Sequence, residues 1–197
     1  MKSYVELPQG YREIDSIDLQ KNKKLSLLVN GLALLIGVLM AVPMHFVVPI
    51  TALFDMSDGF VAYFIRFGVL MAAMIVYMVL HEWVHGVTMK LCGTKKVKYG
   101  FTGLYAFAGS EDYYDKRSYI TIALAPIVVW GVVLLVLNLL VPTQWFWVVY
   151  LVQITNISGA AGDLYVTYRF SRLPADILVR DYGVGMTVYS QMTEEVQ

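Results

Sequence analysis

The sequence predicts an all-α integral membrane protein with four transmembrane helices. Of its 197 residues, 58% are hydrophobic and 15% are charged, whereas a typical soluble domain is about 45–50% apolar and about 25% charged. Four apolar segments also come close to the roughly 20 residues that an α-helix needs to cross a bilayer. Composition and segment length therefore point to the same class of protein.

The expected spans cover residues 25–48, 60–80, 119–141 and 145–170. The helical pattern of the second span continues beyond Leu80 and through His85 until Gly93 provides a stop. Pro126 lies inside the third span. Because no repeat, low-complexity tract or flexible linker interrupts the chain, we expect one membrane domain.

Outside these spans, lysine and arginine residues lie on one side only. They precede the first span, occur in the loop 93–118 between the second and third, and follow the fourth. The opposite loops, 49–59 and 142–144, contain neither residue type. Positively charged loops are retained on the cytoplasmic side of a membrane, so both termini are predicted to be cytoplasmic.

The cytoplasmic loop is the one place where extended structure is expected. Between Lys96 and Ser110, aromatic residues, valine and glycine are mixed in a way that favours a small β-hairpin at the membrane surface. We therefore divide the chain into a cytoplasmic N-terminal segment (1–24), a four-helix membrane domain (25–170) and a cytoplasmic tail (171–197).

Charge and cysteine content exclude several classes of site. The net charge is zero, and no basic run with interleaved aromatics occurs, so nucleic acid is not an expected partner. Cys92 is the single cysteine, which excludes an internal disulfide and a zinc finger built on several thiolates. A metal bound by this chain would use histidine and carboxylate ligands.

The segment His81-Glu82-Trp83-Val84-His85 has the HExxH pattern on a predicted helix. Residues four apart share a helix face, so both imidazoles can point at one metal ion. The adjacent Glu82 can then reach a water bound to that ion. Zinc lowers the pKa of such a water to about 7, and the carboxylate of Glu82 would accept its proton during attack on a carbonyl. The pattern predicts hydrolysis of amide bonds.

A structural interpretation of the two histidines also exists. Lys90 is only five residues beyond His85, so His81 and His85 would in that case mark the cytoplasmic interface of the helix. This interpretation leaves Glu82 unexplained, because ionisable residues inside membrane helices are costly and usually mark functional sites. We therefore favour the metal site.

Asp163 is the expected third metal ligand. It lies six residues before Arg169 in the fourth span, and His85 lies five residues before Lys90, so the two are predicted at a similar depth. The small residues at 159–162 let helices approach closely. Two alternatives remain open for Asp163, a cap on a helix that restarts after Gly162 and an ion pair with Arg169. The loop acids Glu111, Asp112 and Asp115 are rival ligands in a polar cluster.

Asn156 and Pro126 are two further candidates. Asn156 lies seven residues before Asp163, which is two turns of a continuous helix and therefore the same face. It is a candidate substrate-binding residue, although an ordinary bond between helices would explain it equally well. Pro126 would kink the third span and leave a backbone carbonyl that needs another partner.

These motifs resemble those of a known family. The chain is similar to the site-2 protease group of intramembrane zinc metalloproteases, and more closely to a bacterial family of membrane zincin peptidases. The resemblance covers about residues 60–170 and rests on the HExxH segment 81–85, on Ala125-Pro126, and on 156–163. The chain departs from the family pattern in having Gly162-Asp163-Leu164 for Leu-Asp-Gly and Ala125 for a glycine, and it has no room for a PDZ-like domain.

The resemblance implies specific roles for these residues. His81, His85 and Asp163 would be the ligands of Zn2+, and Glu82 would be the catalytic base. Enzymes of this kind cut membrane proteins or peptides within or beside a transmembrane helix. The resemblance also implies a location in the bacterial cytoplasmic membrane, with the lipid bilayer as the surrounding medium.

Motif and resemblance together predict an intramembrane zinc metallopeptidase that opens toward the cytoplasm. A second interpretation is a membrane metal-binding regulator or subunit that keeps the zincin fold without turnover. A metal transporter is less favoured, because one polar cluster near one membrane face gives no continuous polar path across the bilayer. Glu82 discriminates between the first two interpretations, since only catalysis needs its carboxylate.

Overall fold

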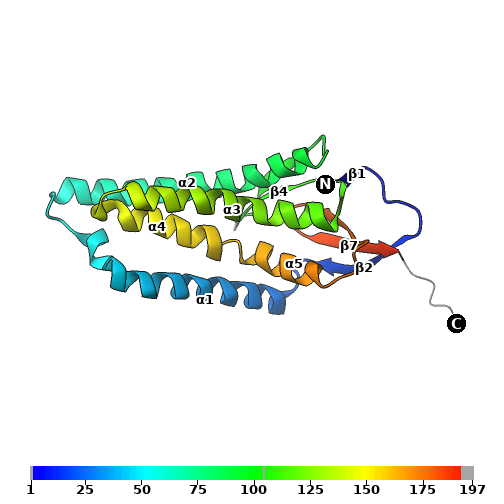
Figure 1. Ribbon diagram of the computed structural model, residues 1–197, viewed down its shortest axis with the longest axis horizontal. Coiled ribbons are helices and arrows are strands. Elements are labelled where there is room, and N and C mark those ends of the chain that lie inside the picture. The colour runs from blue at the N-terminus through cyan, green and yellow to red at the C-terminus, as the bar shows by residue number, and fades with distance from the viewer. Residues whose placement is uncertain (1, 104, 192–197) are drawn as a thin grey trace. The chain divides into compact units, whose positions relative to one another are not determined.

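The computed structural model describes residues 2–103 and 105–191, most of them in helices (Figure 1). The chain forms two compact units. The mixed unit comprises Met1–Leu27, Glu82–Ala125 and Asp163–Gln197, and the helical unit comprises Leu28–His81 and Pro126–Gly162. The helices are α1 (Lys23–Val47), the 3-10 helix η1 (Ile50–Phe54), α2 (Phe60–Leu91), α3 (Lys116–Leu140), α4 (Thr143–Ser158) and α5 (Ala161–Ser171).

Three of the described helices, α1, α2 and α3, are long and apolar enough to cross a membrane. They correspond to the first three predicted spans. Helix α2 runs 32 residues without interruption, as its predicted extension beyond Leu80 requires. Its hydrophobic surface is largely exposed, which is the pattern of a helix whose natural surroundings are apolar.

The fourth predicted span is not one helix. Residues 145–170 are divided between α4, with 16 residues, and α5, with 11, each shorter than a bilayer crossing needs. The break follows Gly159, where a Cβ atom would lie 2.6 Å from the carbonyl oxygen of Thr155. The small residues at 159–162 therefore end one helix and start another. A fourth crossing stays a prediction.

The helical unit has its own apolar core. Helices α3 and α4 lie side by side in it (Figure 1), and the amide of Gln153 approaches the carbonyl of Gly131 at 3.4 Å. Trp147 is fully buried and donates its indole N–H to the carbonyl of Val48 at 3.0 Å, which ties α4 to the end of α1. The buried members are Leu53, Leu70, Tyr77, Leu134, Trp147, Val148 and Val152.

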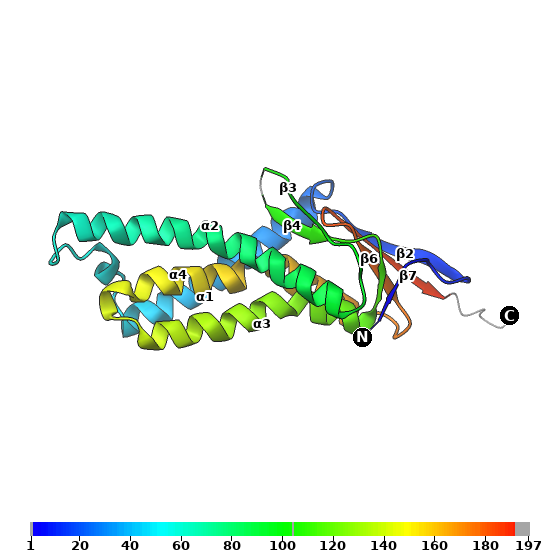
Figure 2. The same ribbon diagram turned by 90° about the horizontal axis from the view of Figure 1, so that it is seen from above.

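The prediction of an all-α protein with at most one small hairpin is wrong for the mixed unit, which contains two antiparallel sheets (Figure 2). The larger has the order β1-β5-β6-β7-β2, and the smaller pairs β3 with β4. Both predicted tails contribute strands, and β2 near the N-terminus pairs with β7 near the C-terminus. The strands are β1 (Ser3–Tyr4), β2 (Tyr11–Ile17), β3 (Lys98–Phe101), β4 (Ala106–Gly109), β5 (Tyr113–Asp115), β6 (Leu178–Asp181) and β7 (Met186–Gln191).

The core of the mixed unit joins one face of the larger sheet to helix ends. Val179 of β6 and Val188 of β7 are fully buried there with Phe170 of α5. Burying apolar area contributes roughly 25 cal/mol per Å2, so this contact helps to hold α5 against the sheet. The cluster consists of Ile17, Met89, Cys92, Tyr114, Tyr119, Ile122, Ala123, Val166, Phe170, Ile177, Val179 and Val188.

The predicted hairpin between Lys96 and Ser110 is confirmed as β3 and β4, with Tyr99 opposite Ala108. The hairpin is packed closely on both sides. Gly86 of α2 leaves space for the ring of Tyr99, which a Cβ atom would occupy. The amide of Ser110, at the end of β4, donates to the carbonyl of Asp181 at 2.7 Å. The hairpin is thereby fixed beside the second half of α2.

Candidate metal centre

Helix α2 places the HExxH residues one turn apart. His81 and His85 are buried, with exposed fractions of 9% and 8%, so both imidazoles are largely shielded from solvent. Histidine so far inside a protein needs hydrogen-bond partners or a metal ion. Glu82 lies between them and is partly exposed, which is the position of a group that can meet an incoming substrate.

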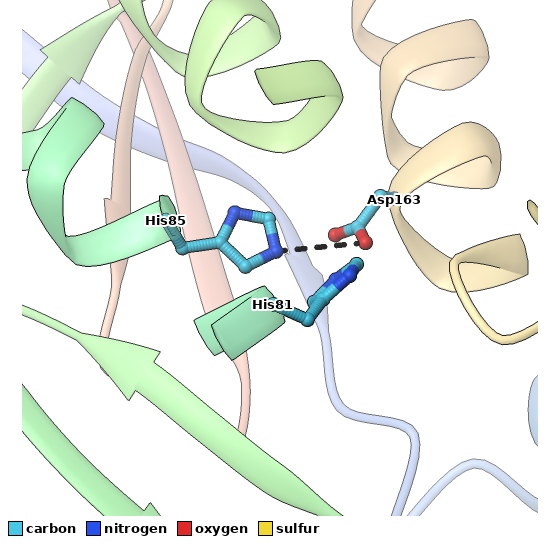
Figure 3. A group of neighbouring side chains, drawn as sticks. All are labelled: His81, His85 and Asp163. Carbon is cyan, nitrogen blue, oxygen red and sulfur yellow. Dashed lines mark ion pairs between the residues drawn. The ribbon is translucent and has the colours of Figure 1, made fainter. Parts of the chain in front are cut away.

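Asp163 lies in the first turn of α5 and faces these histidines (Figure 3). Its Oδ2 atom is 3.6 Å from Nε2 of His85. One donor atom from each of His81, His85 and Asp163 lies within 4.8 Å of the other two. Ligands bound to one zinc ion at about 2.0–2.2 Å lie roughly 3–3.5 Å apart, so small side-chain rotations would let all three share an ion.

The two alternatives for Asp163 are thereby answered in part. Helix α5 does restart at Ala161, and an acidic residue in its first turn favours the positive end of the helix dipole. Arg169, however, is paired with Asp15, at 2.7 Å between Nε and Oδ2. The donor geometry fits a metal ligand, and the assignment of Asp163 as ligand rests on it.

Two of the three rival acids of the loop, Glu111 and Asp115, have other partners. Glu111 forms ion pairs with Lys98, at 2.7 Å, and with Arg180. These cations hold the pKa of Glu111 below its usual value. Asp115 caps α3 by accepting the Ser118 amide at 2.7 Å. Among the residues that the structure describes, His81, His85 and Asp163 form the one group with metal-binding geometry.

His85 is oriented by the carbonyl that Pro126 leaves without a helical partner. In α3 the carbonyl of Ile122 would normally accept the amide of residue 126, but proline has no N–H. Nδ1 of His85 lies 2.9 Å from this carbonyl oxygen. A carbonyl only accepts, so Nδ1 carries the proton and Nε2 is the nitrogen directed toward Asp163. The backbone carbonyl that Pro126 leaves free therefore has a proposed zinc ligand, His85, as its partner.

Replacing Pro126 with alanine should weaken zinc binding. Alanine at this position has an N–H that returns the Ile122 carbonyl to the helix ladder, and His85 would then compete for its acceptor. We expect the zinc dissociation constant to rise about 10-fold, which is the lower end for lost outer-shell partners. Competition with a chromophoric chelator measures this constant.

Pro43 offers the matched control, because it also lies inside a predicted membrane helix, α1, whereas the proposed ligands belong to α2 and α5. Pro43→Ala should leave the zinc dissociation constant unchanged. A folded Pro126→Ala variant with wild-type zinc affinity would show that the Ile122 carbonyl does not orient His85.

His81 is held by a second hydrogen-bonded chain. Its Nδ1 atom is 2.8 Å from the hydroxyl of Tyr77, one turn earlier in α2. That hydroxyl donates to Oδ1 of Asn156 at 2.9 Å. Nδ2 of Asn156 donates to the carbonyl of Ile127 at 3.1 Å. Asn156, whose exposed fraction is 0%, is thus linked to His81 through Tyr77. The helix on which we predicted it to share a face with Asp163 is broken between the two residues.

Glu82 is bordered by the β3–β4 hairpin. The backbone amide of Ala108 in β4 is in hydrogen-bonding contact with its carboxyl group. The carboxylate of Asp163 also acts electrostatically on Glu82. The predicted base is therefore in contact with the backbone of β4 as well as close to the proposed ligands His85 and Asp163.

Asp181 is a neighbour of the site that sequence reasoning missed. It ends β6, in the segment predicted to be a soluble tail. Its carboxylate accepts the hydroxyl of Tyr119 and the amide of Gly183, each at 2.8 Å. Burial raises the pKa of Asp181, and the two hydrogen bonds oppose that rise. It interacts electrostatically with His85 and Asp163, so the site contains more acidic groups than the motif shows.

Comparison with known proteins places the chain in a family. Residues 74–178, just over half of the chain, match the model of a family described as "Putative zincin peptidase". An uncharacterised 24.7 kDa protein of Pyrococcus woesei is 31% identical over 136 residues, which cover 64% of this chain and 56% of that protein. The match thus spans little more than half the length of that relative. No solved structure matches the chain.

Proposed function

Because the chain belongs to the family described as "Putative zincin peptidase", we propose that it is an intramembrane zinc metallopeptidase that hydrolyses membrane proteins or peptides. The observation that carries the proposal is the meeting of His81, His85 and Asp163 within 4.8 Å. Two neutral imidazoles and one carboxylate are a ligand set that catalytic zinc uses, with a further position for water or substrate. His81, His85 and Asp163 would hold the ion.

The chemistry assigns separate tasks to the surrounding residues. Zinc, when bound, supplies a Lewis acid and lowers the pKa of water to about 7. The Glu82 carboxylate accepts a proton from the attacking water as a bond forms from the water oxygen to the peptide carbonyl carbon. Glu82 then gives that proton to the departing nitrogen as the C–N bond breaks. No proton is gained or lost overall.

The surroundings of the site favour action within a membrane. Helices α1, α2 and α3 are apolar enough to cross a bilayer, and the proposed ligands His81 and His85 lie within α2. Polar groups at such a position need protein or water around them. We place the protein in the cytoplasmic membrane with both termini in the cytoplasm, as the distribution of lysine and arginine predicts.

Strand β4 offers an edge on which a substrate backbone could be held. The Ala108 amide contacts Glu82 and therefore points away from β3. Alternation along a strand turns the amide of Ala106 the same way, while Phe107 and Gly109 face β3. A substrate paired at this edge would be extended and close to Glu82. Pairing of this kind satisfies backbone groups that lipid cannot.

Proline at position 106 tests this route. Ala106→Pro removes the outward amide without removing a bond between β3 and β4, so KM should rise by roughly 2- to 10-fold, the value of one hydrogen bond. Phe101→Pro is the matched control. Phe101 lies opposite Ala106, and its amide also points outward, but at the edge of β3 and not at the edge of β4. Equal KM values for the two variants would contradict pairing along β4.

Reconstituted protein tests the proposed activity itself. The probe is a lysine-flanked peptide with about 20 apolar residues and a fluorophore and quencher at its two ends, placed in liposomes with the purified protein. We expect cleavage by zinc-loaded protein, its loss on removal of zinc by a chelator, and its return on adding zinc back. Cleavage that persists in zinc-free protein, or zinc-loaded protein that leaves a panel of such peptides intact, contradicts the proposal.

A further inference from the structure

The side chain of Asn156 has a fixed orientation, because one of its partners can only accept. The Ile127 carbonyl oxygen lies 3.1 Å from Nδ2 of Asn156 and requires a donor there. Turning the amide over would place Oδ1 against that carbonyl, so that two acceptors would face each other. The contact with Ile127 therefore directs Oδ1 of Asn156 toward Tyr77, at 2.9 Å.

This orientation determines the direction of the next two hydrogen bonds. Oδ1 of Asn156 is an acceptor, so the Tyr77 hydroxyl uses its single proton there. The Tyr77 oxygen can then only accept from the other side, where Nδ1 of His81 lies at 2.8 Å. Nδ1 of His81 must accordingly carry a proton, and Nε2 is the nitrogen with the lone pair.

We infer that Tyr77 and Asn156 are positioning residues that hold His81 in the Nδ1-protonated tautomer, ready to bind a metal ion through Nε2. The inference rests on the proposed function and assigns to Asn156 a role in building the site. Both residues are buried, Tyr77 with 7% and Asn156 with 0% of their surface exposed. Water therefore does not readily replace either member of the chain, and an interrupted chain leaves a buried polar group unsatisfied.

The two histidines are thus prepared by different means. His85 donates directly to the Ile122 carbonyl, at 2.9 Å. His81 donates through two side chains that end on the Ile127 carbonyl of the same helix, α3. Outer-shell partners of this kind fix ring orientation and raise the basicity of the ligand nitrogen.

Nitrogen-15 NMR of histidine-labelled protein tests the tautomer in the absence of zinc. The chain has three histidines, so single replacements assign each signal. At a pH where imidazole is neutral, His81 should show a protonated Nδ1 and an unprotonated Nε2, and Tyr77→Phe should give a mixture of tautomers. A wild-type His81 protonated at Nε2 overturns the inference, whatever the variants do.

Zinc affinity supplies the second readout. Tyr77→Phe and Asn156→Leu should each raise the zinc dissociation constant by about 10- to 100-fold. Because both residues act through His81, the zinc dissociation constant of the double variant should not exceed the larger of the two single-variant constants. Affinities within threefold of wild type, or fully additive losses, would overturn the inference.

Two control variants separate this role from a general loss of packing. Tyr150→Phe removes a hydroxyl that donates to the Met40 carbonyl, and Thr155→Val removes one that donates within α4 to the Leu151 carbonyl. Both should keep wild-type zinc affinity and the wild-type His81 tautomer. If wild-type protein binds no zinc, the proposed function fails, while the NMR result still decides the inference.

Discussion

Glu82→Gln should abolish most peptide hydrolysis while leaving zinc bound. Glutamine keeps the size of the side chain and an oxygen that can accept the Ala108 amide, but it cannot take a proton from water at neutral pH. General-base catalysis typically contributes 10²–10⁴-fold, so we expect the cleavage rate in liposomes to fall by about that factor. Zinc content and rate are measured on the same preparation.

Glu111→Gln is the matched control for this change. Glu111 is an exposed glutamate in the loop after β4 and pairs with Lys98 and Arg180. Its replacement should leave both rate and zinc content near wild type. A Glu82→Gln protein that cleaves at the wild-type rate would contradict a catalytic role for Glu82. A Glu82→Gln protein that does not hydrolyse peptides but keeps the wild-type activity in cells would favour a regulator without turnover.

Asp163→Ala should have the largest effect on metal binding. The variant removes the one carboxylate of the ligand set and leaves two imidazoles on a single helix turn. Loss of outer-shell partners costs 10- to 100-fold in affinity, and loss of a direct ligand should exceed that. We expect the zinc dissociation constant to rise by more than about 100-fold. Without a bound ion, hydrolysis should fall to background.

The local part of the site was predictable from sequence. The spacing of His81 and His85 places them on one face of any α-helix, whatever surrounds it. Asp163 required an argument about depth, which the positions of Lys90 and Arg169 supplied. The contact of Asp163 with His85 agrees with that argument.

The fold was less predictable where the chain pairs over long distances. Strand β2 meets β7 with Tyr11 opposite Gln191, and short amphipathic segments carry little information about such distant partners. The tails therefore looked like soluble extensions. For the same reason Asp181, which ends β6 in that region, was not among the predicted site residues.

The route by which Asn156 reaches the site was also misjudged. Periodicity placed it on the same face as Asp163, but periodicity holds only within one helix, and Gly159 ends α4 between them. Its hydrogen bonds to Tyr77 and Ile127 depend on the packing of α4 against α2 and α3. The predicted contact of Asn156 with substrate stays a prediction.

Zinc affinity measured on wild-type protein, Asp163→Ala and Asp112→Ala tests the metal centre most directly. Asp112 is the matched acid, because it belongs to the rival loop cluster and lies outside the ligand group that the structure brings together. The account predicts one tightly bound zinc per chain in wild type and Asp112→Ala, and almost none in Asp163→Ala. Equal zinc binding by wild type and Asp163→Ala, or zinc lost from Asp112→Ala alone, would contradict it.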